Sequence, residues 1–414
     1  MHSVAEPLGA LSDHSILLPS EPLPPGTLVA IDYETFYSAS YSISDLGLYG
    51  YTHHPEFDAY LVVIYADGLR WVGHPKDAPW HLIAACVWLS HNRGFDDAVH
   101  ERIIETGVIP AVRPREWHCT ANCAVFHHLP RSLKDAVQAL YGVALSKNTR
   151  DKAMKGKRWA EFGEALQKEV CEYAMGDGVW CLRLGKDLLP SWPILERELS
   201  DITYRMGNYG MQIDVDGVDR DIKVLERVLF EARRRIPWAE EKAPLSMPAL
   251  KEHCRKIGIE PPTSLAKDSE ACANWEEKYG EQHDFVSAMR DFRRSNAMLE
   301  KFLTLRSRVK PDGRMPFALL YGGAHTLRWS GSGGFNMQNM PRDPFYFDAN
   351  WRFTTKENAV HSVWLRDKFI AAPGHKLCIS DFAQIEARVT PWLAGDTKTL
   401  ELAAKGMSVY EIHA

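Results

Sequence analysis

The first half of the chain carries the two-residue alternation and the apolar runs that are typical of β-strands. Four segments share this pattern, and each is bounded by turn-forming residues: 27–34, 58–66, 69–73 and 86–92. The fourth run ends before Gly94, and Val99, Ile103 and Ile104 then fall on one side of a predicted helix. This part of the chain is therefore predicted to form a sheet with helices packed on it.

The second half follows a helical period over long stretches. Amphipathic helices are predicted at residues 194–206, 216–235, 250–257 and 285–305. Pro190 and Pro193 precede the first of these helices, and a domain boundary is predicted there, between 27–192 and 193–414. Residues 1–26, with several prolines near their end, are predicted to be a flexible leader. The pattern as a whole predicts an α/β protein.

A short apolar run near the C-terminal end is predicted to form a strand. Residues 376–380 follow a turn at Pro373 and Gly374, and Asp381 stands at the end of the run. A helix N-cap is the alternative explanation for that carboxylate. The next helix is predicted to bury one face, made of Ile385, Val389, Trp392 and Leu393. Upstream, another strand is predicted at residues 315–321.

With 414 residues and a formal net charge of −5, the chain is long enough for two or three domains. The negative balance disfavours binding of nucleic acid through one overall positive field, so such contacts would need local basic surfaces. The eight cysteines follow no disulfide framework and suit a reducing cytoplasm. No apolar run is long enough to span a membrane and the start lacks a signal-peptide pattern, so no membrane partner is expected.

Two further groups of residues have ordinary explanations. Cys119 and Cys123, with three histidines nearby, resemble half of a zinc site, but no second pair follows at zinc-finger spacing. A helical turn with incidental thiols is the favoured interpretation. The basic residues from Lys147 to Arg158 are interpreted as a solvated loop, with contacts to phosphates as the alternative.

Acidic residues stand at the ends of the predicted strands and on one later helix. Asp32 and Glu34 lie two residues apart, so one face of a strand presents both. Asp96 begins the helix that follows the fourth strand, and Tyr173 and Asp177 share a helical face at positions i and i+4. A solvated face is the ordinary explanation for one such pair, but groups of carboxylates also hold divalent cations.

In order and spacing, three motifs resemble those of the DEDD 3′–5′ exonucleases in their tyrosine variant: Asp32-x-Glu34, Asn92-x-x-Phe95-Asp96 and Tyr173-x-x-x-Asp177. The resemblance implies a ribonuclease H-like domain with a mixed central sheet at residues 27–192, which degrades a single-stranded 3′ end. The implied ligands of two Mg²⁺ or Mn²⁺ ions are Asp32, Glu34, Asp96 and Asp177. Tyr173 would position the attacking water. Asp97 is assigned to structure, although a swap of roles with Asp96 stays open.

Residues 381–388 read Asp-Phe-Ala-Gln-Ile-Glu-Ala-Arg, which resembles the first palm motif of the family A DNA polymerases. Upstream, Arg328 and the block at 336–341 resemble the family's Thr-Gly-Arg-x-Ser and Asn-x-Gln-Asn-x-Pro blocks in their phage form. Leu327 stands where the family usually has glycine, which affects the expected loop geometry. The resemblance implies a helical thumb at about residues 215–310 and an incomplete palm at about residues 311–414.

The same resemblance implies roles for individual residues. Asp381 and the backbone carbonyl of Phe382 would hold the two Mg²⁺ or Mn²⁺ ions of a polymerase site. Gln384 and Glu386 would contact the incoming deoxynucleoside triphosphate, with Glu386 excluding a ribose 2′-hydroxyl. The residues implied to bind the DNA primer-template are Arg328, Asn336, Gln338, Asn339 and Arg388.

The predicted protein is a DNA-directed DNA polymerase, a nucleotidyltransferase, with a proofreading 3′–5′ exonuclease. The family's fingers helix and second palm carboxylate are not found among residues 1–414, so this chain is not expected to extend a primer unless a separate C-terminal polymerase fragment completes it. Two alternatives stay open: a free-standing exonuclease of the ribonuclease D type, and a DNA-holding subunit of a split polymerase. A phage or prophage protein of this kind is expected in the cytoplasm of a bacterial host.

Overall fold

The structure is a computed structural model that describes residues 16–145, 154–266, 269–408 and 411–412. Two compact units make up the chain, Met1–Phe369 and Ile370–Ala414, and each is described by itself. The boundary predicted at residue 193 lies inside the first unit and stays a prediction. Along the described ranges, no helix is both long and apolar enough to cross a lipid bilayer.

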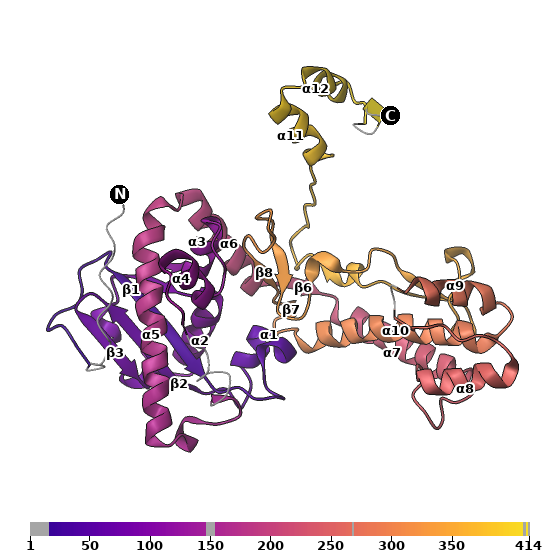
Figure 1. The fold of residues 1–414 in the computed structure, drawn as a ribbon, viewed down its shortest axis with the longest axis horizontal. Coiled ribbons are helices and arrows are strands. Elements are labelled where there is room, and N and C mark those ends of the chain that lie inside the picture. Colours follow the sequence, from indigo (N-terminus) through magenta and orange to yellow (C-terminus); the bar gives the residue numbers. More distant parts are fainter. Residues whose placement is uncertain (1–15, 146–153, 267–268, 409–410, 413–414) are drawn as a thin grey trace. The chain divides into compact units, whose positions relative to one another are not determined.

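A five-stranded mixed sheet forms the centre of the N-terminal part (Figure 1). Its strands are β1 (Leu28–Thr35), β2 (Ala59–Ala66), β3 (Leu69–Gly73), β4 (Val87–Ser90) and β5 (Glu116–Cys119). Their order is β3-β2-β1-β4-β5, with β1, β2 and β3 antiparallel and β1, β4 and β5 parallel. The four predicted strands are thus confirmed, and β1 lies in the middle of the sheet.

Four helices cover the two faces of this sheet: α2 (Arg93–Glu105), α3 (Thr120–Phe126), α4 (Leu133–Tyr141) and α5 (Glu164–Leu188). Strand alternation directs Ile31 towards the core shared with α2, and Ala30 towards the core shared with α3, α4 and α5. The long helix α5 runs closely over the sheet (Figure 1). A Cβ at Gly178 of α5 would come within 2.8 Å of Val63 in β2, so glycine permits this approach.

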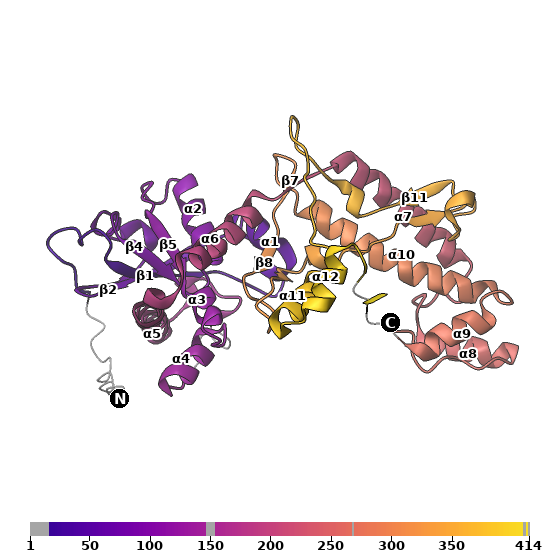
Figure 2. The same cartoon turned by 90° about the horizontal axis from the view of Figure 1, so that it is seen from above.

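Helices dominate the following part of the first unit: α6 (Ile194–Tyr209), α7 (Val215–Arg234), α8 (Met247–Ile257), α9 (Glu270–Tyr279) and α10 (Asp284–Ser307). α7 and α10 lie side by side (Figures 1 and 2) and share a core that includes Leu225 and Phe302. The four predicted helices are confirmed. Helices α9 and α1 (Ile43–Thr52) are additional, because glycines or charged residues interrupt their apolar pattern.

Short strands connect these helices: β6 (Met211–Ile213), β7 (Arg314–Met315), β8 (Ala318–Leu320), β9 (Ser330–Ser332), β10 (Phe345–Phe347), β11 (His361–Val363) and β12 (Phe369–Ile370). β8 and β9 form an antiparallel hairpin, called the β8–β9 hairpin below. The single strand predicted at 315–321 is therefore two strands. Pro316 separates them, because proline has no backbone N–H to donate to a ladder.

The second unit contains α11 (Ile385–Ala394) and α12 (Thr397–Ala404). The strand predicted at 376–380 is wrong: these residues are exposed and irregular, since no described segment pairs with their backbone. The buried face predicted for α11 is also wrong, because Trp392 and Leu393 are 67% and 74% exposed. The N-cap of α11 is Gln384 and not Asp381, so the alternative explanation for Asp381 fails as well.

Part of the predicted leader is held by hydrogen bonds. Leu17 exchanges two backbone hydrogen bonds of 2.9 and 2.8 Å with Arg70 of β3. The N–H of Leu23 donates to the carbonyl of Leu82, and the Leu23 side chain packs on the sheet core. Leucines of residues 16–26 therefore have apolar and backbone partners, which the sequence did not indicate. The flexible leader stays a prediction, and residues 1–15 lie outside the described residues.

Candidate active site

A cleft of about 650 Å³ brings the residues of the three nuclease-like motifs together. Its lining includes Asp32 and Glu34 of β1, Asp96 of α2, and Tyr173 and Asp177 of α5. β1 contacts both α2 and α5, so these three elements meet at the central sheet. The structure therefore brings the three motifs together in one cleft, as expected. The chemical roles of the residues stay predictions.

The direction of the first acid pair follows from its strand. Asp32 and Glu34 alternate with Ile31 and Tyr33, which are buried in the sheet core. β1 is hydrogen-bonded to β2 on one side and to β4 on the other, so its backbone is held in place. A one-residue shift would turn both acids into the core, and the buried residues between them prevent it.

Asp96 is tied to the same strand. Its carboxylate accepts the backbone N–H of Tyr33 at 3.1 Å, and only 2% of the residue is exposed. Burial raises the pKa of Asp96 well above its usual value, the Tyr33 N–H lowers it, and the nearby charge of Glu34 raises it further. Asp96 therefore lies within electrostatic reach of the acid pair on β1.

The neighbouring Asp97 lies in a different pocket. Its carboxylate pairs with Arg93 at 3.5 Å, in a group that also includes Asp201. Burial raises the pKa of Asp97 to about 6, and the Arg93 charge opposes that rise. This placement supports the assignment of Asp96 to the cleft and of Asp97 to a structural ion pair.

Tyr173 and Asp177 face the acid pair from α5. The phenol of Tyr173 hydrogen-bonds the Asp177 carboxylate. Burial raises the pKa of Tyr173, and the charges of Asp177, Glu34 and Asp32 raise it further. The phenol is therefore neutral and available to donate a hydrogen bond among three carboxylates.

A buried chain of hydrogen bonds beneath the cleft, from Tyr33 through His100, was not predicted from the sequence. The Tyr33 O–H lies 2.7 Å from Nδ1 of His100, and Nε2 of His100 lies 2.7 Å from the carbonyl of Val112. The carbonyl can only accept, so Nε2 carries the proton and Nδ1 accepts from Tyr33. Burial lowers the pKa of His100. This neutral chain fixes Tyr33, which stands between the two acids of β1.

The donor set of the cleft fits hard divalent cations. Carboxylate oxygens are the ligands that Mg²⁺ and Mn²⁺ prefer, and four such groups line the cleft. In the described part of the chain, no three His, Cys, Asp or Glu side chains converge closely enough to hold a metal ion. Like charges without a cation repel, and Asp96 is turned to the Tyr33 N–H, so binding would require the side chains to rotate.

The predicted primer-template residues of the first unit gather around the β8–β9 hairpin. Asn336 caps the short helical turn Met337–Asn339, with its Oδ1 2.9 Å from the N–H of Gln338. Nε2 of Gln338 donates to the carbonyl of Trp329 at 3.1 Å, beside Arg328 in the hairpin loop. Arg328, Asn336, Gln338 and Asn339 therefore belong to one local structure.

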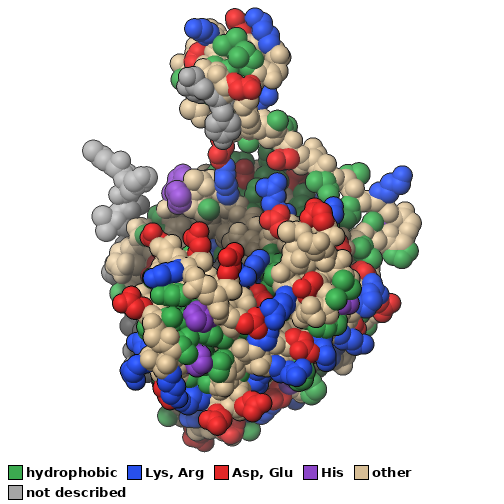
Figure 3. Space-filling view, turned by 90° about the vertical axis from the view of Figure 1, so that its right-hand side faces the viewer, with side chains coloured by type: hydrophobic (Ala, Val, Ile, Leu, Met, Phe, Trp, Pro, Cys, Tyr) green, Lys and Arg blue, Asp and Glu red, His purple; other side chains and the backbone are tan. Residues whose placement is uncertain are grey.

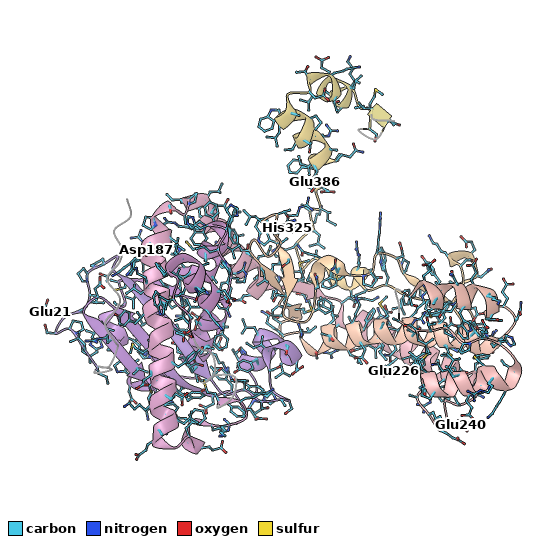
Figure 4. All side chains as sticks on the ribbon, viewed as in Figure 1. Glu21, Asp187, Glu226, Glu240, His325 and Glu386 are labelled. Carbon is cyan, nitrogen blue, oxygen red and sulfur yellow. The ribbon has the colours of Figure 1, made fainter. Side chains whose placement is uncertain are left out.

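The palm-motif residues lie at the start of α11 in the second unit. Asp381 and Phe382 are exposed in irregular backbone, and Glu386 lies in the first turn of α11 (Figure 4). Gln384 donates to Oγ of Ser408 at 3.1 Å, and Nε of Arg388 donates to the carbonyl of residue 383 at 2.9 Å. The motif is thus a helix start with its own side-chain contacts.

Basic and acidic side chains are interspersed over the face of the first unit in Figure 3, as the net charge of −5 suggests. Of the predicted basic run, residues 147–153 lie outside the described residues. Arg158 lies within 3.6 Å of Glu56 and 3.5 Å of Asp58, in ion pairs. Cys119 and Cys123 are buried free thiols, and their interpretation as incidental stays a prediction.

Leu327 has a left-handed backbone conformation with φ of 60°. This is the position at which the resembled polymerase family usually has glycine. A side chain at this φ costs about 1–2 kcal/mol. We expect Leu327→Gly to be more stable than Leu327→Ala by about 1 kcal/mol, because only glycine removes the backbone strain. Urea denaturation of both variants measures the difference. A Leu327→Ala variant as stable as Leu327→Gly would show that the backbone is unstrained.

Comparisons with known proteins find similarity to DNA polymerases. No protein-family model matches it. The chain is 25% identical over 433 residues to the DNA polymerase of Bacillus phage SP02, covering 93% of this chain and 64% of the relative. The fold resembles the POL domain of Pol1 from M. smegmatis, solved in complex with DNA primer-template and dNTP. The TM-score is 0.53 at 17% identity, covering 90% of this chain and 62% of that one.

The chain thus spans somewhat less than two thirds of the length of each of these proteins. The structural likeness concerns the fold, while the phage relative is matched along nearly the whole of this chain. The resemblance of this chain to the family A DNA polymerases of the phage type is therefore confirmed.

Proposed function

We propose that this chain is part of a DNA-directed DNA polymerase whose residues 27–192 form a ribonuclease H-like 3′–5′ exonuclease domain. The cleft that gathers Asp32, Glu34, Asp96, Tyr173 and Asp177 carries the proposal. Similarity to a phage DNA polymerase along 93% of the chain supports the polymerase part. The substrate of the nuclease is a single-stranded DNA 3′ end, and the substrates of the polymerase are primer-template and deoxynucleoside triphosphates.

In the nuclease, the four carboxylates would hold two Mg²⁺ or Mn²⁺ ions, which would neutralise phosphate charge and activate water. Asp32 and Glu34 contribute oxygens from a fixed strand, and Asp96 and Asp177 contribute theirs from two helices. The neutral Tyr173 phenol orients the attacking water, since it can donate one hydrogen bond and accept another.

In the polymerase, Asp381 and the Phe382 carbonyl would hold the catalytic cations, and Gln384 and Glu386 would contact the incoming nucleotide. Arg388 and the group Arg328, Asn336, Gln338 and Asn339 contact the primer-template. Those side chains offer the donors and acceptors that match the minor-groove edges of paired bases. Residues of about 215–310 act as the thumb and those beyond 310 as part of the palm.

A free-standing exonuclease is the second candidate. The same cleft would serve it, but such an enzyme has no use for the β8–β9 hairpin residues or for the palm motif. The similarity to a DNA polymerase extends far beyond the nuclease-like domain, which favours the first candidate.

The nuclease is tested with a 5′-labelled single strand and Mg²⁺ or Mn²⁺. We expect products that shorten stepwise from the 3′ end, and no cleavage when EDTA removes the metal. A non-hydrolysable 3′-terminal linkage should block the reaction, whereas a blocked 5′ end should not. Cleavage from the 5′ end, or cleavage unaffected by EDTA, would contradict the proposal.

Tyr173→Phe should lower kcat of this hydrolysis by about 10²-fold, the scale of one positioned proton-transfer group. The substitution removes only the phenol oxygen that hydrogen-bonds Asp177. Tyr141→Phe is the matched control, because Tyr141 makes a comparable 2.7 Å hydrogen bond to Asp187 outside the cleft. Equal kcat values for the two variants would remove Tyr173 from the mechanism.

A further inference from the structure

One wall of the cleft comes from a distant part of the sequence. Leu320 of β8 and Ser332 of β9 line the same cleft as Asp32 and Asp177. Pairing of Ala318 with Ser332, and of Leu320 with Ser330, puts these four side chains on one face of the hairpin. The β8–β9 hairpin therefore presents one of its faces to the acids.

The hairpin is anchored in the nuclease-like core at the end of β8. Tyr321 is only 6% exposed and packs with Trp192 and with core residues of the sheet. Its carbonyl accepts a hydrogen bond from Arg131, and its hydroxyl donates to Glu196. A rotation of the hairpin away from the cleft would break this buried set of contacts.

A second anchor holds the hairpin after β9. The guanidinium of Arg308, at the end of α10, donates to the carbonyl of Gly333 and, at 3.0 Å, to the carbonyl of Ser44. Ser44 lies at the start of α1 and also lines the cleft. A Cβ at Gly334 would come within 2.8 Å of the Ser44 carbonyl, so glycine permits the close approach. Both ends of the hairpin are thus fixed beside the cleft.

The charges around the cleft suit a nucleic-acid strand. Arg131 and Lys134 line it together with the carboxylates, so the cleft presents both positive and negative groups. Phosphates along a strand would meet the basic groups, while the terminal phosphodiester would reach the acids. Between the acids and the fixed hairpin, the strand would lie against Leu320 and Ser332.

We propose that the β8–β9 hairpin is a strand-selecting wall of the nuclease cleft, with Leu320 and Ser332 contacting the single-stranded 3′ end. The inference rests on the proposed nuclease function. A single strand fits between the acids and the wall, whereas a paired end brings a second strand that collides with it. The hairpin thereby restricts the cleft to unpaired 3′ ends, and Arg308 is a positioning residue that holds it.

The first test introduces a large side chain from the hairpin into the cleft. Ser332→Trp should lower kcat/KM on oligo(dT) by about tenfold or more, because a misplaced strand loses its reacting geometry. Hydrolysis of a small ester, thymidine 5′-(p-nitrophenyl phosphate), should fall less than hydrolysis of oligo(dT), since a single nucleotide meets less of the wall than a strand does. Leu319→Trp is the control, because Leu319 lies on the other face of the hairpin.

The second test loosens the wall without entering the cleft. Arg308→Met removes the hydrogen bonds to residues 44 and 333. It should raise KM for oligo(dT), leave kcat on the small ester unchanged and reduce the preference for unpaired over paired 3′ ends. Arg306→Met is the matched control, since Arg306 sits two residues earlier and pairs with Asp219 on the surface.

A readout that needs no hydrolysis separates this inference from the proposed function. An oligonucleotide with a 3′-terminal phosphorothioate and a photoreactive 4-thiothymine should crosslink, in Mn²⁺, to the peptide that holds residues 318–332. Crosslinking only to other peptides would overturn the wall even in an active nuclease. Unchanged strand preference in both Ser332→Trp and Arg308→Met, with Tm values like the parent's, would overturn it as well. A crosslink in a chain that hydrolyses neither substrate would support the wall and contradict the nuclease.

Discussion

Replacing Asp32 and Glu34 together by alanine should lower the rate of metal-dependent hydrolysis of a single-stranded 3′ end by about 10³-fold or more. Metal-ion stabilisation of a transition state is worth several kcal/mol, and each 1.36 kcal/mol is about tenfold in rate. Both side chains extend from the middle strand of the sheet into the cleft, so the double substitution removes two of the four carboxylates that would bind the cations. The measurement is release of labelled nucleotide from oligo(dT) in Mn²⁺.

The same variant should fold like the parent. Two neighbouring carboxylates without a cation repel, so their removal is not expected to lower Tm. Asp67→Ala with Asp187→Ala removes the same charge from the same region and outside the cleft, and should leave the rate unchanged. Metal-dependent cleavage that persists in purified Asp32→Ala/Glu34→Ala protein would show that the acids of β1 are not part of the nuclease.

Phe302→Ala should lower the free energy of unfolding by about 3–5 kcal/mol, the usual range for a large aromatic side chain removed from a core. Phe302 is 0% exposed and lies in the core between α7 and α10, the two helices of the predicted thumb. The lost contacts include apolar groups from both helices, and a rigid helix pair cannot close fully around the cavity. Urea denaturation followed by circular dichroism measures the change.

Leu303→Ala is the matched control on the same helix. Leu303 is 42% exposed, so its truncation should cost less than about 1 kcal/mol. A similar loss for both variants would mean that the α7–α10 core does not stabilise this part of the chain. The Phe302→Ala protein should also keep the small-ester activity of the nuclease at temperatures where both variants are folded.

The local pattern of apolar and polar residues determined much of the secondary structure of the first unit. The four strand runs, the helices at 194–206, 216–235, 250–257 and 285–305, and the positions of the acids on them follow from periods of two and 3.6 residues. Such periods depend on neighbours in the sequence and on the need to bury one face. The three acid motifs could therefore be placed on β1, α2 and α5 before any tertiary contact was known.

Elements that depend on distant partners could not be predicted in this way. Residues 376–380 have the apolar composition of a strand, but a strand forms only where another backbone pairs with it, and no described segment does. Leu17 and Leu23 find such partners in β3 and the sheet core, which the sequence did not indicate. Both segments carry apolar side chains, and the presence of a partner decided the outcome.

The same distinction between local pattern and tertiary contact applies to the cleft. The sequence by itself determined that four carboxylates stand in motifs that resemble those of a nuclease, and the pattern of strands and helices placed them on the elements that carry them. Only the tertiary structure decided what surrounds them: the hydrogen bonds from Tyr33 through His100 beneath the cleft, and the hairpin held by Tyr321 and Arg308 at its wall. These contacts join residues that are far apart in the chain. They depend on the shapes of folded elements and on hydrogen bonds between them, and such contacts leave no periodic pattern in the sequence.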